Sequence, residues 1–171
     1  MIVHGAPAVG KLTIARCVHS SLGGLLYDNH SSLELIKPKI PYGAPGFSDA
    51  VWCERVTFFR HAFEEKQNVV FTLAYDPRKH TDRLSKIGDL GKAFNVNLFM
   101  AYLHCDTAER LKRATNPTRQ NAGKADAATL REVEKQSRFE RIPGAHLTID
   151  TGIYCAQESC EKILEQIRSL R

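Results

Sequence analysis

The first residues with the types and spacing for chemistry lie at the start of the chain, in the stretch GAPAVGK at positions 5–11. This spacing is typical of a phosphate-binding loop, G-x-x-x-x-G-K. Such a loop turns its backbone N–H groups toward an anion, and the lysine adds a positive charge for the outer phosphates. We therefore expect a nucleotide to be held by Gly5, Ala8, Val9, Gly10, Lys11, Leu12 and Thr13.

The residue after the lysine usually carries a hydroxyl that contributes to Mg²⁺ binding, but here it is Leu12, and Thr13 follows. We expect the Thr13 hydroxyl to contribute to Mg²⁺ binding instead. The alternative is that the stretch is an ordinary turn and Lys11 a surface lysine. The neighbouring residues favour a nucleotide site, because Ile2-Val3 can end a strand and residues 11–22 have the apolar spacing of a helix.

Two aspartates follow predicted strands, where they could reach a phosphate acceptor or a metal ion. Asp28 follows residues 25–27, and Asp76 follows the apolar run 68–75. Either carboxylate could orient or deprotonate an acceptor hydroxyl, and either could organise the water around Mg²⁺. Both could instead be capping or turn residues. The sequence leaves this choice open.

Basic residues gather around a polar stretch late in the chain. Arg110 and Arg113 precede it, and Arg119 and Lys124 lie within it. Guanidinium groups compensate the negative charge that phosphoryl transfer spreads over the equatorial oxygens. We expect a catalytic role of this kind for Arg119, together with Lys11. For Arg110 and Lys124 the preferred interpretation is a solvated basic helix face.

Alternating strands and helices must position these residues. Continuous apolar runs predict strands, of which 68–75 and 96–105 are expected to be buried on both faces. Strands are expected at 2–3, 25–27, 68–75, 96–105 and 146–150, and helices at 11–22, from a Ser48 cap to 63, at 84–94, 106–116, 128–138 and 156–170. This alternation favours a mostly parallel α/β sheet covered on both sides. Polar inserts at about 31–50 and 115–128 could form lids over a site at the carboxyl ends of the strands.

The length and composition fit one globular domain that spans residues 1–171. No long apolar run and no signal peptide is present, so we expect a cytoplasmic protein that does not span a membrane. The net charge of +5 suits an anionic partner. No nucleic-acid-binding signature accompanies this charge, so a small phosphorylated metabolite is the preferred partner. The oligomeric state stays open.

The cysteines and strand histidines receive structural interpretations. The cysteines form no C-x-x-C pair, and we expect all five to be reduced: Cys17, Cys53, Cys105, Cys155 and Cys160. His4 and His104 lie in buried strand patterns. We expect both to be core histidines with satisfied hydrogen bonds.

The stretch GAPAVGKLT resembles the loop of nucleoside monophosphate kinases, G-x-P-x-x-G-K-x-T, in which threonine comes one place later than usual. The late threonine is similar to that of P-loop small-molecule kinases. With NH after the second strand and NPTR late in the chain, the longer stretch GAPAVGKLTIAR is similar to bacterial P-loop proteins labelled AAA-family ATPases or shikimate kinase-like. This resemblance implies a three-layer P-loop NTPase fold, with a five-stranded parallel sheet in the order 2-3-1-4-5 and helices on both faces.

The resemblance also implies site roles and an activity. Arg113 would contact the nucleotide, Thr151 would lie beside the adenine, and Arg119 would be the lid arginine. The implied activity is ATP- and Mg²⁺-dependent phosphoryl transfer to a small-molecule acceptor, with Thr13 and Asp28 near the metal. The acceptor, and the choice of ATP over GTP, stay open. Two alternatives are a nucleotide-binding regulatory ATPase without transferase activity and a polynucleotide 5′-hydroxyl kinase.

Overall fold

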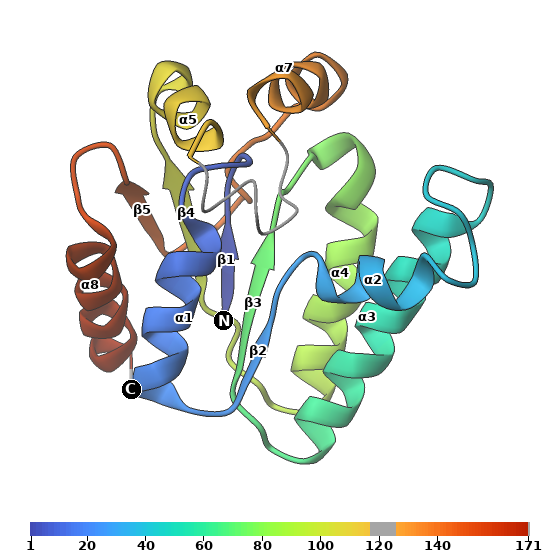
Figure 1. Ribbon diagram of the computed structural model, residues 1–171. Coiled ribbons are helices and arrows are strands. Elements are labelled where there is room, and N and C mark those ends of the chain that lie inside the picture. Colours follow the sequence, from blue (N-terminus) through green and yellow to red (C-terminus); the bar gives the residue numbers. More distant parts are fainter. Residues whose placement is uncertain (117–125, 171) are drawn as a thin grey trace.

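A computed structural model describes residues 1–116 and 126–170 and contains a five-stranded parallel sheet (Figure 1). The strands run in the spatial order β2-β3-β1-β4-β5, and each neighbouring pair is parallel. Their bounds are Ile2–His4 (β1), Leu25–Tyr27 (β2), Val69–Leu73 (β3), Met100–His104 (β4) and Leu147–Asp150 (β5). The expected fold class and strand order are therefore confirmed.

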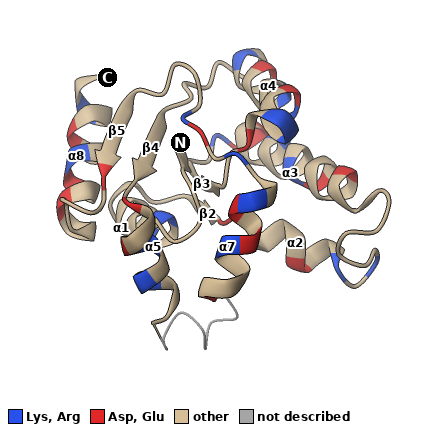
Figure 2. Ribbon diagram, turned by 90° about the horizontal axis from the view of Figure 1, so that it is seen from above, with Lys and Arg blue, Asp and Glu red and all other residues tan. Residues whose placement is uncertain are grey.

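Helices cover both faces of the sheet and the carboxyl ends of its strands (Figure 1). One face is covered by α1 (Lys11–Leu22) and α8 (Ala156–Ser169). The other side carries α2 (Ser31–Ile36), α3 (Phe47–Glu64) and α4 (Pro77–Ala93). Above the carboxyl ends of the strands lie α5 (Thr107–Ala114) and α7 (Ala127–Gln136). Seen from above, α7 lies between α5 and α2 (Figure 2). None of the described helices is both long and apolar enough to cross a bilayer.

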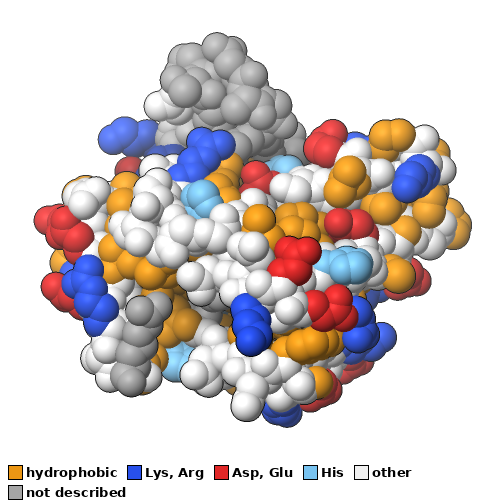
Figure 3. Space-filling view, turned by 90° about the horizontal axis from the view of Figure 1, so that it is seen from below, with side chains coloured by type: hydrophobic (Ala, Val, Ile, Leu, Met, Phe, Trp, Pro, Cys, Tyr) orange, Lys and Arg blue, Asp and Glu red, His pale blue; other side chains and the backbone are white. Residues whose placement is uncertain are grey.

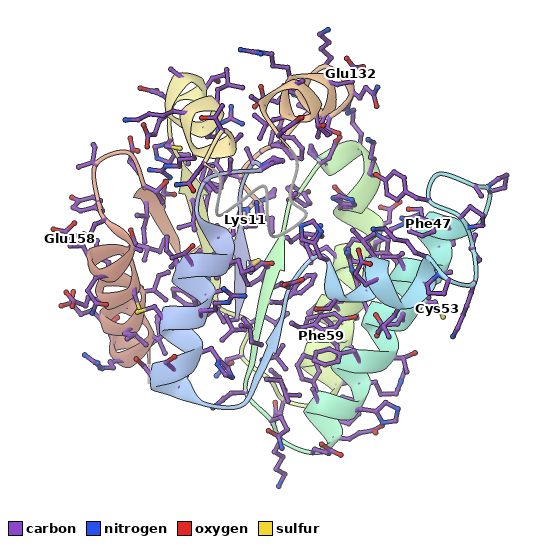
Figure 4. The ribbon with its side chains drawn as sticks, in the orientation of Figure 1. Lys11, Phe47, Cys53, Phe59, Glu132 and Glu158 are labelled. Atoms are coloured by element: carbon purple, nitrogen blue, oxygen red, sulfur yellow. A yellow bond between two sulfur atoms is a disulfide. The ribbon has the colours of Figure 1, made fainter. Side chains whose placement is uncertain are left out.

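Two apolar layers hold the sheet between these helices. On the α3 side, Phe59 packs edge-on against Phe71 of β3 with ring centroids 5.3 Å apart, and Figure 4 shows Phe59 within α3. Val3, Ile14 and Ile163 belong to the layer on the α1 and α8 side. All five residues are fully buried. Burying a side chain of this size stabilises the fold by about 1.5–3 kcal/mol.

The strand predictions are confirmed for β3 and corrected for β4. Every residue of β3 is buried, as expected of a strand covered on both faces. In β4 buried residues alternate with partly exposed ones. Tyr102 and His104 are among the partly exposed positions, and both line a cavity of about 340 Å³.

The insert at 31–50 is more ordered than predicted. It contains α2 and the start of α3. The cap of α3 is Gly46, at φ 83°, and not Ser48, so that expectation was wrong. The Ser48 hydroxyl instead accepts a hydrogen bond from Arg83 of α4 at 2.5 Å. Ser48 thus lies within the first turn of α3 and links it to α4. Most of the expected lid at 115–128 lies outside the described residues.

The expectation of five reduced cysteines was wrong for one pair. Cys17 of α1 and Cys160 of α8 form a disulfide, with Cα atoms 6.1 Å apart. The two helices pack side by side on the same face of the sheet, which brings together residues 143 positions apart in sequence. Cys53, Cys105 and Cys155 are free.

Neither strand histidine is the satisfied core residue that we expected. His4 is fully buried, but neither ring nitrogen has a hydrogen-bond partner among the described residues. Its ring stacks on Tyr102 at 5.2 Å. Burial, reinforced by the charges of Lys11 and Arg141, lowers the pKa of His4 to about 3. His104 is partly exposed and lies 3.8 Å from a carboxylate oxygen of Asp150.

Candidate active site

The turn after β1 has the backbone geometry that its glycines predict. Gly5 adopts φ 149°, and a Cβ atom built there would lie 2.1 Å from the carbonyl oxygen of Leu103. Gly10 adopts the left-handed φ of 91° and is the N-cap of α1. Any side chain at Gly5 would collide with β4, and one at Gly10 would strain the backbone. The loop therefore needs both glycines to connect β1 to α1.

Lys11 reaches back across this loop. Its ammonium donates to the carbonyl oxygens of Gly5 at 2.9 Å and Ala6 at 2.7 Å, and Figure 4 shows Lys11 at the upper end of α1. The first helical hydrogen bond of α1 runs from the Ile14 N–H to the Gly10 carbonyl. The N–H groups of residues 11–13 thus precede the helical ladder. A helix start with such donors, next to a lysine, attracts an anion.

A cavity of about 640 Å³ opens beside the loop. Its walls come from the loop, the ends of β2 and β3, and helices α2, α3, α4 and α7. This volume lies within the usual range for small-molecule sites. The cavity brings together seven of the predicted site residues: Ala8, Gly10, Lys11, Leu12, Thr13, Asp28 and Asp76.

Asp28 has one engaged oxygen and one available oxygen. Its Oδ1 accepts from the backbone N–H groups of His30 at 2.7 Å and Ser31 at 2.9 Å, so it closes the turn that leads into α2, whose N-cap residue is His30. No hydrogen bond to Oδ2 is found among the described residues. The turn and functional interpretations are therefore compatible, because one oxygen fixes the carboxylate while the residue lines the cavity.

Asp76 is more heavily engaged. Its side chain is 1% exposed. Its oxygens accept from the guanidinium of Arg78 at 3.1 and 2.9 Å, and from the backbone N–H groups of Arg78 at 3.0 Å and Arg138 at 3.1 Å. The Arg78 guanidinium holds the pKa of Asp76 well below its usual range. Asp76 thus joins the start of α4 to the segment after α7.

Arg113 and Thr151 lie together, but on the β5 side of the loop and outside this cavity. Arg113 donates from Nη1 to the Thr151 hydroxyl at 3.1 Å and from Nη2 to the Thr151 carbonyl at 2.6 Å. The Thr151 hydroxyl also lies 3.0 Å from the carbonyl oxygen of Val9. Arg113 therefore links α5 to the loop through Thr151. Gly5 and Val9 contribute backbone to the loop without lining the cavity.

The remaining basic residues separate into two cases. Arg110 is almost fully buried and forms an ion pair with Glu134, together with a 2.9 Å hydrogen bond to Thr107. The expectation of a solvated face was therefore wrong for Arg110, which joins α5 to α7. Arg119 and Lys124 lie outside the described residues.

The sequence analysis missed Arg55 of α3, a buried arginine that lines the cavity. It donates to the Ser32 hydroxyl at 2.9 Å and to the backbone and side-chain oxygens of Asn29 at 3.2 and 3.1 Å. Its guanidinium lies 4.7 Å from the centre of the Trp52 ring. Burial lowers the pKa of Arg55 to about 10, so it stays charged at neutral pH. The signal was an arginine within the apolar stripe of α3, between Trp52 and Phe59.

The donor set of the cavity fits a magnesium ion bound mainly through phosphates and water. No group of three His, Cys, Asp or Glu side chains that could hold a metal is found in residues 1–116 and 126–170. Mg²⁺ at kinase sites usually takes one or two protein oxygens beside phosphate oxygens and water. The Thr13 hydroxyl and the Asp28 carboxylate both line the cavity and are oxygen ligands of the required kind.

No family model and no curated protein matches this sequence. Solved structures do resemble the fold. A gluconokinase from Sinorhizobium meliloti is 15% identical with a TM-score of 0.65, over 99% of this chain and 91% of that chain. The APS kinase of Mycobacterium tuberculosis, solved with AMPPNP and APS, is 12% identical with a TM-score of 0.63, over 98% and 96%. Shikimate kinase from Aquifex aeolicus is 14% identical with a TM-score of 0.55, over 99% and 98%.

These likenesses extend over nearly the full length of both chains in each comparison. The chain therefore has the fold of the P-loop kinases, with the sheet order expected from its sequence. At this level of identity the likeness establishes the fold, and the chemistry must be argued from the site itself.

Proposed function

We propose that this protein is an ATP- and Mg²⁺-dependent phosphotransferase that acts on a small-molecule acceptor. The observation that carries the proposal is the shared cavity, which is lined by Lys11 and Thr13 from the phosphate loop and by Asp28 from the end of β2. A phosphate donor and an acceptor could therefore meet in one cavity. Phosphoryl transfer needs mainly such positioning and charge compensation.

The nucleotide phosphates would lie against the backbone N–H groups of residues 10–13. Lys11 would exchange the carbonyl oxygens of Gly5 and Ala6 for phosphate oxygens. Mg²⁺, when bound near Thr13, would offset the charge of the phosphates. Arg113 and Thr151 flank the other side of the loop and would support the nucleoside part. The lid role of Arg119 stays a prediction.

Of the two aspartates, we assign the acceptor hydroxyl to Asp28. Its Oδ2 is available while Oδ1 fixes the side chain on α2. Asp76 is less suited to take a proton, because Arg78 and Arg138 occupy its oxygens and its pKa is depressed. We assign Asp76 the positioning of α4 and of the segment that follows α7.

Arg55 indicates that the acceptor carries negative charge. Its hydrogen-bond partners are neutral oxygens of Ser32 and Asn29, and no carboxylate accepts from it among the described residues. The charge of Glu54 acts to raise the pKa of Arg55, but Glu54 accepts no hydrogen bond from it among the described residues. A buried charge that is not directly paired with an opposite charge is costly. A carboxylate or phosphate group on the acceptor would supply that partner within the cavity.

The test is a screen for compounds that accelerate ATP consumption, covering sugars, sugar acids, nucleosides, nucleotides and short oligonucleotides. We expect one small-molecule class to give acceptor-dependent turnover. Lys11→Ala should abolish it, and Lys92→Ala should not, since Lys92 is an exposed residue of α4. Asp28→Asn should lower kcat about 100-fold or more with the KM for ATP little changed.

Other outcomes would favour the alternatives. Slow ATP hydrolysis that no acceptor accelerates would support a regulatory ATPase. Turnover stimulated by oligonucleotides alone would support a polynucleotide kinase. The face seen from below shows basic, acidic and apolar side chains interspersed, without a continuous basic surface (Figure 3). That face therefore offers no support for nucleic-acid binding.

A further inference from the structure

The ring of His80 is held in one orientation by the backbone of its own helix. The N–H group of Asp76 donates a hydrogen bond to His80 Nδ1 at 3.0 Å. A backbone N–H can only donate, so Nδ1 must present its lone pair. The proton of the neutral imidazole is therefore on Nε2. The start of α4 fixes the tautomer as well as the position of the ring.

Nε2 belongs to a side chain that lines the 640 Å³ cavity, and no hydrogen bond from it is found in the described part of the chain. The ring packs against Trp52, with centroids 5.4 Å apart. Arg55 lies over the same Trp52 ring at 4.7 Å. His80 and Arg55 thus flank one indole and share one wall of the cavity.

Both groups on this wall are donors toward the cavity. Arg55 has no acceptor atom in its guanidinium, and His80 has spent its only lone pair on the Asp76 N–H. A ligand group placed here must therefore offer oxygen lone pairs. An ammonium group would gain no hydrogen bond from Arg55 or His80 and would be repelled by the charge of Arg55.

We propose that His80 is a specificity-determining residue, which donates from Nε2 to an oxygen of the phosphate acceptor and, with Arg55, selects hydroxy acids over amines. This inference rests on the proposed function and narrows its substrate class. The acceptor is then a small compound with a hydroxyl to be phosphorylated and a carboxylate or similar oxyanion set against the Trp52 wall.

The His80 imidazole stays neutral, with its donor at Nε2, over the ordinary pH range. Burial, reinforced by the charge of Arg55, lowers the pKa of His80 to about 4. The charge of Asp76 raises the pKa of His80, while the charges of Arg83 and Lys79 lower it further. Acceptor binding through His80 is therefore expected to stay constant between pH 6 and 8.

Two substitutions separate the donor function of His80 Nε2 from the hydrogen bond that Nδ1 accepts from Asp76. His80→Asn keeps an oxygen near the position of Nδ1 for the Asp76 N–H but does not reach as far as Nε2. His80→Gln places an amide donor near the position of Nε2. We expect His80→Asn to raise the KM for a sugar acid about 10- to 100-fold, the value of one hydrogen bond to a charged group. His80→Gln should recover most of this loss, with the KM for ATP unchanged in both.

A binding measurement keeps this test independent of turnover. D-gluconate is titrated into the protein saturated with ADP and Mg²⁺, with D-glucose and D-glucosamine as matched neutral and cationic probes, while the ring ¹⁵N signals of His80 are followed. We expect Nε2 to carry the proton before titration, to shift with gluconate, and not to shift with glucosamine. Gluconate affinity should fall at least 10-fold in His80→Asn and recover in His80→Gln.

Three results would overturn the inference: a proton on Nδ1 of His80, equal affinity of the protein for gluconate and glucosamine, or equal gluconate affinity in the His80→Asn and His80→Gln variants. Failure of the proposed function looks different. In that case no acceptor accelerates ATP consumption, while the tautomer and the preference for gluconate are still observed.

Discussion

The Lys11 ammonium donates a hydrogen bond to the carbonyl oxygen of Gly5, 2.9 Å away, so the lysine braces the loop that it follows. A second bond reaches Ala6 at 2.7 Å. The charge is therefore held beside the loop before any phosphate arrives. Loop geometry and the phosphate affinity that we propose would thus depend on one side chain, and its replacement should alter both.

We expect Lys11→Met to weaken ATP binding about 100-fold, because it removes a charged hydrogen-bond donor and keeps the length of the side chain. Calorimetric titration with ATP and Mg²⁺ measures the change. Lys92→Met, at an exposed site of α4, is the control and should bind ATP as the wild type does. Unchanged affinity in Lys11→Met would remove the nucleotide site from this loop.

Gly5→Ala should destabilise the fold by about 3 kcal/mol or more, because its Cβ would meet the Leu103 carbonyl oxygen at 2.1 Å. Gly43→Ala is a matched control. Gly43 also has a positive φ, of 80°, but no atom lies within 4 Å of its Cβ position. There we expect a cost of about 1–2 kcal/mol from the backbone alone. Urea unfolding compares the two, and equal losses would contradict the close approach of Gly5 to β4.

His4→Phe should stabilise the protein, and the gain should grow as the pH falls. At neutral pH the change removes a buried polar group without hydrogen bonds, worth about 1–3 kcal/mol. Below pH 6.5 the unfolded chain binds a proton at His4, whereas the folded protein does not until about pH 3. Wild-type stability is therefore lost as the pH falls through this range, by about 2 kcal/mol at pH 5.

Urea unfolding at pH 8 and pH 5 tests this prediction, as the difference between wild type and His4→Phe. His61→Gln is the control, because His61 is an exposed residue of α3. A difference that does not change with pH would mean that His4 has the same pKa in the folded and the unfolded protein.

Reduction of the disulfide should lower the free energy of unfolding by about 2–4 kcal/mol, since Cys17–Cys160 closes a long loop of the chain. Thermal unfolding with and without dithiothreitol measures this difference. Cys17→Ala should lose the response to the reductant, while Cys53→Ala, at an exposed free cysteine, should keep it. A wild type that is insensitive to dithiothreitol would show that the bond makes no contribution to stability.

The sequence by itself determined the parts of this protein that depend on local geometry. The loop from Gly5 to Lys11 was predictable because its glycines and lysine act through nearby backbone. The alternation of strands and helices followed from apolar periodicity, which reports how each segment is buried. The strand order came from the resemblance of the loop to known kinases. The position of Asp28 in a turn was among the predicted alternatives.

Only the tertiary structure decided which distant groups meet. The Arg138 N–H reaches Asp76 across 62 residues and adds to the hydrogen bonds from Arg78 that already engage both carboxylate oxygens. Packing of α1 on α8 joins Cys17 to Cys160, and α3 brings Arg55 into the cavity. Such contacts depend on how whole helices and strands pack together. Apolar periodicity within one segment shows only that one side of that segment is buried, and it does not show which residues will pack against it.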